Sequence, residues 1–115
     1  MKWVSAVIRP SHLDDVVDAL CAIGITRLTV TEVQVYGERP HDAGAHENGE
    51  LPEFQPEFVP RVQVETALPD ERLAEVIDTL GRSARTGTID DGKIIVLALE
   101  RAVRIRTGEI GETAL

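Results

Sequence analysis

The chain has 115 residues, enough for one domain with a modest core, and a formal net charge of −8. This charge disfavours sequence-independent binding to nucleic acid or to an anionic membrane surface. The sequence has no apolar run near the ~20 residues that span a bilayer and no signal-peptide pattern after Met1. The single cysteine, Cys21, cannot form an internal disulfide, which predicts a cytoplasmic protein, and its apolar neighbours predict a core position.

The first third of the chain has the pattern strand, helix, strand. Residues 2–9 are rich in β-forming residues and end before Pro10, which predicts a strand. A helix is predicted next, because apolar residues recur with helical spacing. They are Leu13, Val16, Val17 and Leu20. β-branched residues throughout 25–36 predict a long second strand.

Residues 37–58 differ sharply in composition from the segments on either side. They contain six acidic residues against one basic residue, Arg39, together with three prolines and three glycines. So long a stretch without periodicity in so small a domain predicts a mobile, functional loop with little fixed structure. Its charge predicts that a docking partner presents a basic surface; the alternative is that the loop only keeps the protein in solution.

The second half of the chain repeats the pattern of the first. Residues 59–68 predict a strand with Val62 and Val64 pointing inward. A second helix is predicted to follow Pro69, with Asp70 as its N-cap. Its apolar residues lie sixty positions after those of the first helix. They are Leu73, Val76, Ile77 and Leu80.

The order of these elements defines a fold class. Residues 94–99 predict another strand, so the core reads βαββαβ, and residues 102–107 predict a short C-terminal strand. This order predicts an α+β, ferredoxin-like fold with an antiparallel sheet and both helices on one face. The other face is predicted to be too apolar for water and therefore to oligomerise, as a cyclic trimer or a face-to-face dimer. Its predicted residues include Val33, Val35, Val64 and Ile95.

The stretch 86–93 joins the second helix to the next strand and contains Gly87 and Gly92. Glycines let backbone N–H groups approach a ligand closely, and an anion is favoured when cations are near. The nearby cations are Lys93, Arg104 and Arg106. The stretch therefore predicts a phosphate site. The alternative is a plain Asp-Gly hairpin turn, and the pattern is not a Walker A loop.

With these elements in order, the chain resembles the PII signal-transduction proteins, the nitrogen-regulatory P-II group, over essentially its whole length. The resemblance rests on the order and spacing of eight segments. They are Ile8-Arg9-Pro10, Leu13-Asp14-Asp15-Val16, Gly24-Ile25-Thr26, Leu28-Thr29-Val30-Thr31-Glu32-Val33, Pro60-Arg61-Val62, Thr86-Gly87, Asp91-Gly92-Lys93-Ile94 and Val103-Arg104-Ile105-Arg106-Thr107-Gly108-Glu109.

The resemblance implies a homotrimer that binds an adenine nucleotide (ADP, AMP or ATP) in three clefts between subunits. It assigns residues 37–58 to the T-loop, 86–93 to the B-loop and 102–115 to the C-terminal segment. The T-loop is implied to contact a target protein, for example a transporter or an enzyme. The implied nucleotide contacts are Thr29, Gly37, Glu65, Thr86, Gly87, Asp90, Asp91, Gly92, Lys93, Arg104 and Arg106.

Within that set the resemblance implies distinct roles. Thr29 and Glu65 would lie near the adenine and ribose. The phosphates would be held by Lys93, Arg104 and Arg106, with Arg104 or Arg106 reaching across a subunit boundary. Backbone amides of the B-loop would contribute further donors.

One departure from the family pattern lies in the B-loop, where Asp90 replaces a usual glycine and precedes Asp91. A carboxylate ~4 Å from a phosphate oxygen raises the free energy by on the order of 1–4 kcal/mol. We therefore expect ADP or AMP to compete better than ATP.

A second departure concerns the effector. Arg39 stands where members that sense 2-oxoglutarate place a glutamine that helps to coordinate Mg²⁺. Arginine has no acceptor atom, so we expect weak or absent 2-oxoglutarate binding and leave a role for Mg²⁺ open. Arg9, Arg39 and Arg61 are expected to hold a smaller anion such as bicarbonate, as divergent PII-like proteins of carbon metabolism do. A conventional nitrogen regulator is the less favoured alternative.

The sequence offers no catalytic constellation. It has no nucleophile beside a base, no paired carboxylates and no metal-ligand spacing. We therefore expect a regulatory protein without a resident metal, not an enzyme. The only tyrosine, Tyr36, lies in a predicted strand, so uridylylation of the loop is not expected.

Overall fold

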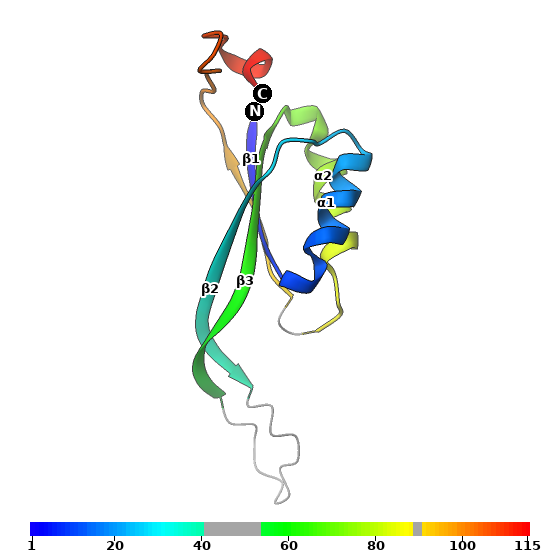
Figure 1. Cartoon of the computed structure of the whole chain (residues 1–115), viewed down its shortest axis with the longest axis vertical. Coiled ribbons are helices and arrows are strands. Elements are labelled where there is room, and N and C mark those ends of the chain that lie inside the picture. Colours follow the sequence, from blue (N-terminus) through cyan, green and yellow to red (C-terminus); the bar gives the residue numbers. More distant parts are fainter. Residues whose placement is uncertain (41–53, 89–90) are drawn as a thin grey trace, which may run out of the picture.

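A computed structural model describes residues 1–40, 54–88 and 91–115. Its main elements are β1 (Lys2–Ile8), α1 (Leu13–Ala22), β2 (Thr29–Pro40), β3 (Phe54–Leu68), α2 (Leu73–Ala84) and β4 (Ile94–Ala98). The four strands form one antiparallel sheet in the order β2-β3-β1-β4 (Figure 1). The predicted ferredoxin-like βαββαβ fold is confirmed. Neither helix within these ranges is long and apolar enough to cross a bilayer.

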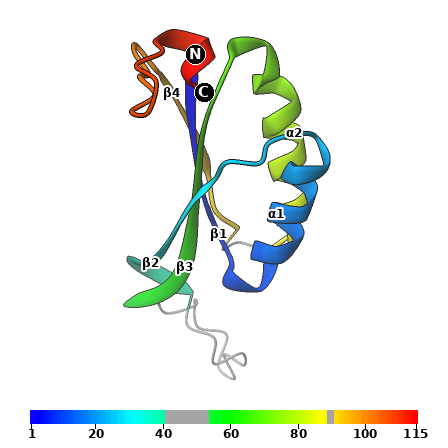
Figure 2. The same cartoon turned by 45° about the horizontal axis from the view of Figure 1, so that its top comes forward.

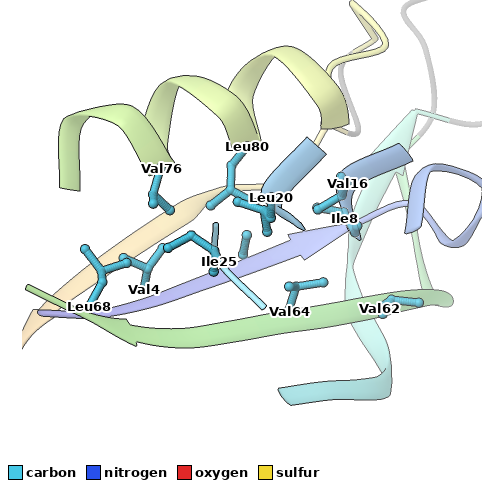
Figure 3. Packing of buried hydrophobic residues seen from close by; sticks show 11 residues of the cluster. Val4, Ile8, Val16, Leu20, Ile25, Val62, Val64, Leu68, Val76 and Leu80 are labelled. Carbon is cyan, nitrogen blue, oxygen red and sulfur yellow. The ribbon is translucent and has the colours of Figure 1, made fainter. Parts of the chain in front are cut away.

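Both helices cover the same face of the sheet, and the core lies between them and the strands (Figure 2). The buried positions of α1 are Val16 and Leu20, and those of α2 include Val76 and Leu80, sixty residues later. Figure 3 shows these side chains above the inward-facing residues of β1 and β3. Each such side chain contributes roughly 1.5–3 kcal/mol of burial free energy. The repeated helical spacing therefore identified the inward stripe of both helices.

Two local predictions about the helices are wrong. Asp70 is not an N-cap: it lies in a 3-10 turn, Asp70–Arg72, that precedes α2, and its carboxylate pairs with the N-terminal amine of Met1 at 2.9 Å. Cys21 is exposed instead of lying in the core. One residue beyond the buried Leu20, the helix has turned by about 100° away from the core.

Strands β2 and β3 pair from Thr29 opposite Glu65 to Pro40 opposite Phe54, and they extend beyond the helices as a two-stranded arm (Figure 1). The extent predicted for the loop 37–58 is therefore wrong at both ends, because 37–40 and 54–58 belong to strands. Its centre, 41–53, lies outside the described residues. Cross-strand pairing extends the arm, and such pairing is invisible in a local sequence window.

The predicted strand at 102–107 is also wrong. The segment makes a single bridge, between Val103 and Ile110, and turns back on itself where the Gly108 amide donates to the Arg104 carbonyl at 2.7 Å. A 3-10 turn, Gly111–Ala114, ends the chain. Among the described residues this segment forms no ladder with any strand of the sheet, so the alternating pattern alone was not enough to make a strand.

The uncovered face of the sheet is more polar than predicted. Val64 is not on it, because this side chain is 3% exposed within the core. Polar residues of neighbouring strands meet on the uncovered face, where the Gln63 amide donates to the Ser5 hydroxyl at 3.0 Å. Ile95 and Leu97 remain more than half exposed there. Oligomerisation through this face remains a prediction.

Candidate functional site

The B-loop (86–93) packs directly against the end of β1. A Cβ built on Gly92 would lie 1.6 Å from the Val7 carbonyl oxygen, so only glycine fits at this position. The Val7 amide in turn donates to the Lys93 carbonyl at 3.4 Å. Glycine in this loop predicted that another group comes close to its backbone. At Gly92 that group is the protein's own Val7 carbonyl.

The carboxylate of Asp91 fills the turn at the start of the B-loop. It accepts hydrogen bonds from the amide of Thr86 at 3.0 Å, from the amide of Gly87 at 2.8 Å and from the Thr86 hydroxyl. Gly87 has a φ of 80°, a conformation that favours glycine and turns its amide toward the carboxylate. The cradle of amides predicted for phosphate is therefore occupied in part by the protein's own carboxylate.

Hydrogen bonding also sets the protonation of this group. The bond from the Thr86 hydroxyl, aided by the two amides and by Arg9, lowers the pKa of the Asp91 carboxyl from 3.8 to about 2. Because the folded-state pKa lies below the ordinary one, the contact stabilises the loop above pH 3.8, and this stabilisation is lost as pH falls through about 2.

We expect the Gly87 amide resonance to titrate with a midpoint of about 2. Thr86→Val, which removes the hydroxyl, should move that midpoint toward 3.8, and Asp91→Asn should abolish the titration. Amide NMR across an acid titration measures all three. A wild-type midpoint at 3.8 would show that the carboxylate is not held in this turn.

Arg9 lies against the B-loop, and its predicted role toward an effector anion stays a prediction. Its Nη2 donates to the Thr88 hydroxyl at 2.5 Å, and its Nε lies 3.7 Å from an Asp91 carboxylate oxygen. The guanidinium therefore offsets part of the negative charge of the B-loop. It also ties the loop to the end of β1.

A pocket of about 200 Å³ opens between the B-loop, the end of β1 and the last turn of α2. Its charged lining consists of Arg9, Arg85, Asp91 and Lys93. Sites for drug-sized ligands usually have about 300–1,000 Å³. The pocket of one chain is therefore smaller than such a site.

The other effector cations are not gathered at one point. Arg61 follows Pro60 on β3, is buried, and donates to the Pro60 carbonyl at 2.8 Å. The register places Arg61 opposite Val33, whereas Arg39 is opposite Gln55, six residues further along the arm. At about 3.3 Å per residue the two backbones are ~20 Å apart. Arg61 lies next to Val62, which pairs with Ile8 at the end of β1, whereas Arg39 lies far from that end.

A second group of predicted contacts lies on the uncovered face. Thr29 and Glu65 are direct neighbours in the β2–β3 register, and both line an open pocket of about 460 Å³. The C-terminal residues Ala114 and Leu115 form part of its wall. Gly37, by contrast, lies on the arm opposite Glu57, and Asp90 lies outside the described residues.

Arg104 lies beside this second group, where its Nη2 donates to the Leu115 carbonyl at 3.2 Å and its Nη1 is 3.9 Å from Glu109. Its Nε is buried and finds no hydrogen-bond partner within the described part of the chain. Arg106 is exposed in the turn that follows.

Lys93 and Arg104 lie on either side of β4. β4 begins beside the B-loop at Ile94, opposite Ala6, and ends at Ala98, opposite Lys2, near the C-terminal turn (Figure 2). Five strand residues span about 16 Å. Lys93 and Arg104, both predicted to hold phosphates, therefore do not meet within one chain.

Sequence reasoning missed one residue of the second group, Trp3. Its indole N–H donates to the Glu65 carboxylate at 3.0 Å, and its ring lines the same pocket. The alternation of β1 placed Trp3 on the uncovered face, but only the strand register brings it to Glu65.

Comparisons with known proteins agree with one another. The family model described as "Nitrogen regulatory protein P-II" matches residues 1–109. The chain is 45% identical to "Nitrogen regulatory protein GlnK" of Escherichia coli (strain K12) and 41% identical to "Nitrogen regulatory protein P-II 1" of the same strain, each over 115 residues and 100% of both chains. The crystal structure of Arabidopsis thaliana PII bound to citrate matches with a TM-score of 0.77 and 36% identity, covering 99% of this chain and 91% of that one.

Proposed function

The chain belongs to the family of P-II nitrogen regulatory proteins, and from this premise we propose that it is a homotrimeric, cytoplasmic signalling protein that binds an adenine nucleotide between subunits. The B-loop end of one protomer would face the end of its neighbour that carries Thr29, Glu65 and Arg104. Occupancy of this cleft would change the T-loop, and the T-loop would change the activity of a target protein. The role is regulatory, without catalysis.

One observation carries this proposal: the residues that suit a nucleotide form two separate half-sites on a protomer, with Lys93 just before β4 and Arg104 beyond its other end. The B-loop half supplies Lys93 and a pocket of about 200 Å³. The other half supplies a larger open pocket and Arg104, whose buried Nε finds no hydrogen-bond partner among the described residues. A cyclic arrangement of copies joins unlike ends and completes every site at once. Citrate in the Arabidopsis PII structure supports an affinity of this fold for multivalent anions.

Native mass spectrometry and calorimetry test the proposal together. We expect a trimer that binds one ADP per subunit. In thermal scans, a ligand at about 100 times its Kd adds about 2.7 kcal/mol of apparent stability. A monomer, or a trimer without adenylate affinity at millimolar ligand, would contradict the proposed function.

The extra carboxylate of the B-loop is expected to set nucleotide preference. Asp91 is already paired with two amides and lies near Arg9, so the unusual charge in this loop is that of Asp90. Asp90→Gly should therefore tighten ATP binding by about tenfold while changing ADP binding by less than about threefold. Calorimetric titration of both nucleotides into both proteins measures this. Wild-type protein that binds Mg²⁺·ATP at least about tenfold more tightly than ADP would remove the preference.

Bicarbonate is the second candidate effector, and the placement of Arg61 favours it over 2-oxoglutarate. Arg61 is buried near the end of β1, so we expect a small anion to reach it more easily than a dicarboxylate, and the backbone of Arg39 is ~20 Å away. ADP titrations with bicarbonate, with 2-oxoglutarate and with neither separate the two effectors. Tighter ADP binding with 2-oxoglutarate alone would favour the conventional nitrogen regulator.

A further inference from the structure

Trp3, the only tryptophan of the chain, projects from the face of the sheet that the helices leave uncovered. Side chains of β1 point alternately to the two faces of the sheet, and those of Val4 and Ala6 are buried in the core on the other face. The indole Nε1 donates to Oε2 of Glu65 at 3.0 Å in a partly buried setting. This bond joins β1 to β3 through side chains as well as through the backbone ladder.

The bond has a fixed polarity. An indole N–H only donates, and an ionised carboxylate only accepts, so Glu65 is held with one oxygen engaged and the other available to a donor. Thr29 stands directly opposite Glu65 in the β2–β3 register, and the same open pocket of about 460 Å³ is lined by Trp3, Thr29 and Glu65. The tryptophan ring supplies an apolar wall beside the carboxylate.

We propose that Trp3 is a positioning residue for nucleoside recognition. Its N–H fixes the Glu65 carboxylate so that the second oxygen accepts a hydrogen bond from the ligand, and its ring limits how the flat base can lie. The donor on the ligand is an exocyclic amine of the base or a ribose hydroxyl. This assignment rests on the proposed nucleotide-binding function and adds to it the residue that orients the recognising carboxylate.

The test uses calorimetry of ADP binding to the full-length protein and to three variants: Trp3→Phe, Glu65→Gln and the double variant. Trp3→Phe keeps the ring and removes the donor, and it should weaken ADP binding by about five- to twentyfold. In the Glu65→Gln background the same change should matter by less than about twofold, because the partner is already altered. A merely structural role would give additive losses.

A matched control and two nucleotide analogues sharpen the test. Glu75→Gln neutralises a carboxylate that pairs with Arg72 at 3.1 Å on α2, outside the pocket lining, and should change ADP binding by less than about twofold. Inosine diphosphate lacks the exocyclic amine, and 2′-deoxy-ADP lacks one ribose hydroxyl. The donor is the group missing from the analogue that binds the wild type more weakly than ADP does and whose affinity Trp3→Phe does not lower further.

Failure of this inference is distinct from failure of the proposed function. The role of Trp3 alone is overturned if the wild type binds ADP and Trp3→Phe binds it with the same affinity. It is also overturned if the losses of affinity in the double variant are additive. Wild type without ADP affinity overturns both. If Trp3→Phe does not fold, the single indole N–H resonance of the native protein decides: a shift on ADP saturation supports the assignment, and an unchanged resonance overturns it.

Discussion

A mixture of Lys93→Ala and Arg104→Ala chains should bind the nucleotide that neither variant binds well alone. Each substitution removes a charged hydrogen-bond donor from one half-site and should weaken binding by about 10- to 150-fold. In a trimer assembled at random from equal amounts, a cleft is intact when its B-loop comes from the Arg104→Ala chain and its other half from the Lys93→Ala chain. That condition holds for about a quarter of the clefts. Calorimetric stoichiometry after co-expression measures the recovered fraction.

The reason for this expectation is the ~16 Å of β4 that separates the two residues within one protomer. Arg82→Ala is a suitable control, because Arg82 pairs with Asp78 on the exposed side of α2, 3.0 Å away, and should leave binding unchanged. Native mass spectrometry confirms that mixed trimers have formed. Mixed trimers that recover no tight site would place the nucleotide within single chains.

Replacing Gly92 by alanine should disable the B-loop without altering any charge in it. The new Cβ would lie 1.6 Å from the Val7 carbonyl oxygen, and backbone cannot move aside as a flexible side chain can. The loop must shift away from β1 and carry Lys93 with it. We expect a loss of about 1–3 kcal/mol or more in unfolding free energy, because the clash overpacks a closed contact. We also expect ADP affinity to fall by at least about tenfold.

Urea unfolding and ADP titration of the same sample measure both effects of Gly92→Ala. Gly81→Ala is the matched control for stability alone: Gly81 lies inside α2, a Cβ there would meet nothing within 4 Å, and the residue lines the pocket beside the B-loop. Because glycine is a poor helix former, this control should be about 0.5–1 kcal/mol more stable than wild type. A Gly92→Ala protein with wild-type stability would show that the loop does not rest on Val7.

Local signals in the sequence located the parts of the B-loop but did not reveal their partners within the chain. Gly87 and Gly92 were read as openings for a ligand. In the folded chain the Gly87 amide donates to Asp91, and Gly92 makes room for the Val7 carbonyl. Arg9 likewise braces Thr88 and Asp91. The type of a residue indicates that a close contact or a charge is needed at its position. It does not indicate which other group makes that contact.

The sequence by itself determined the fold class and the inward faces of the helices, because these depend on periodicity within one segment. The helical spacing of apolar residues predicts a buried stripe wherever the helices lie, as it does for Val16 with Leu20 and for Val76 with Leu80. The arm of β2 and β3, the missing C-terminal strand and the Trp3–Glu65 bond were decided by the tertiary structure alone. Each of these depends on which segment lies alongside another. Strand register carries that information, and no single stretch of the chain contains it.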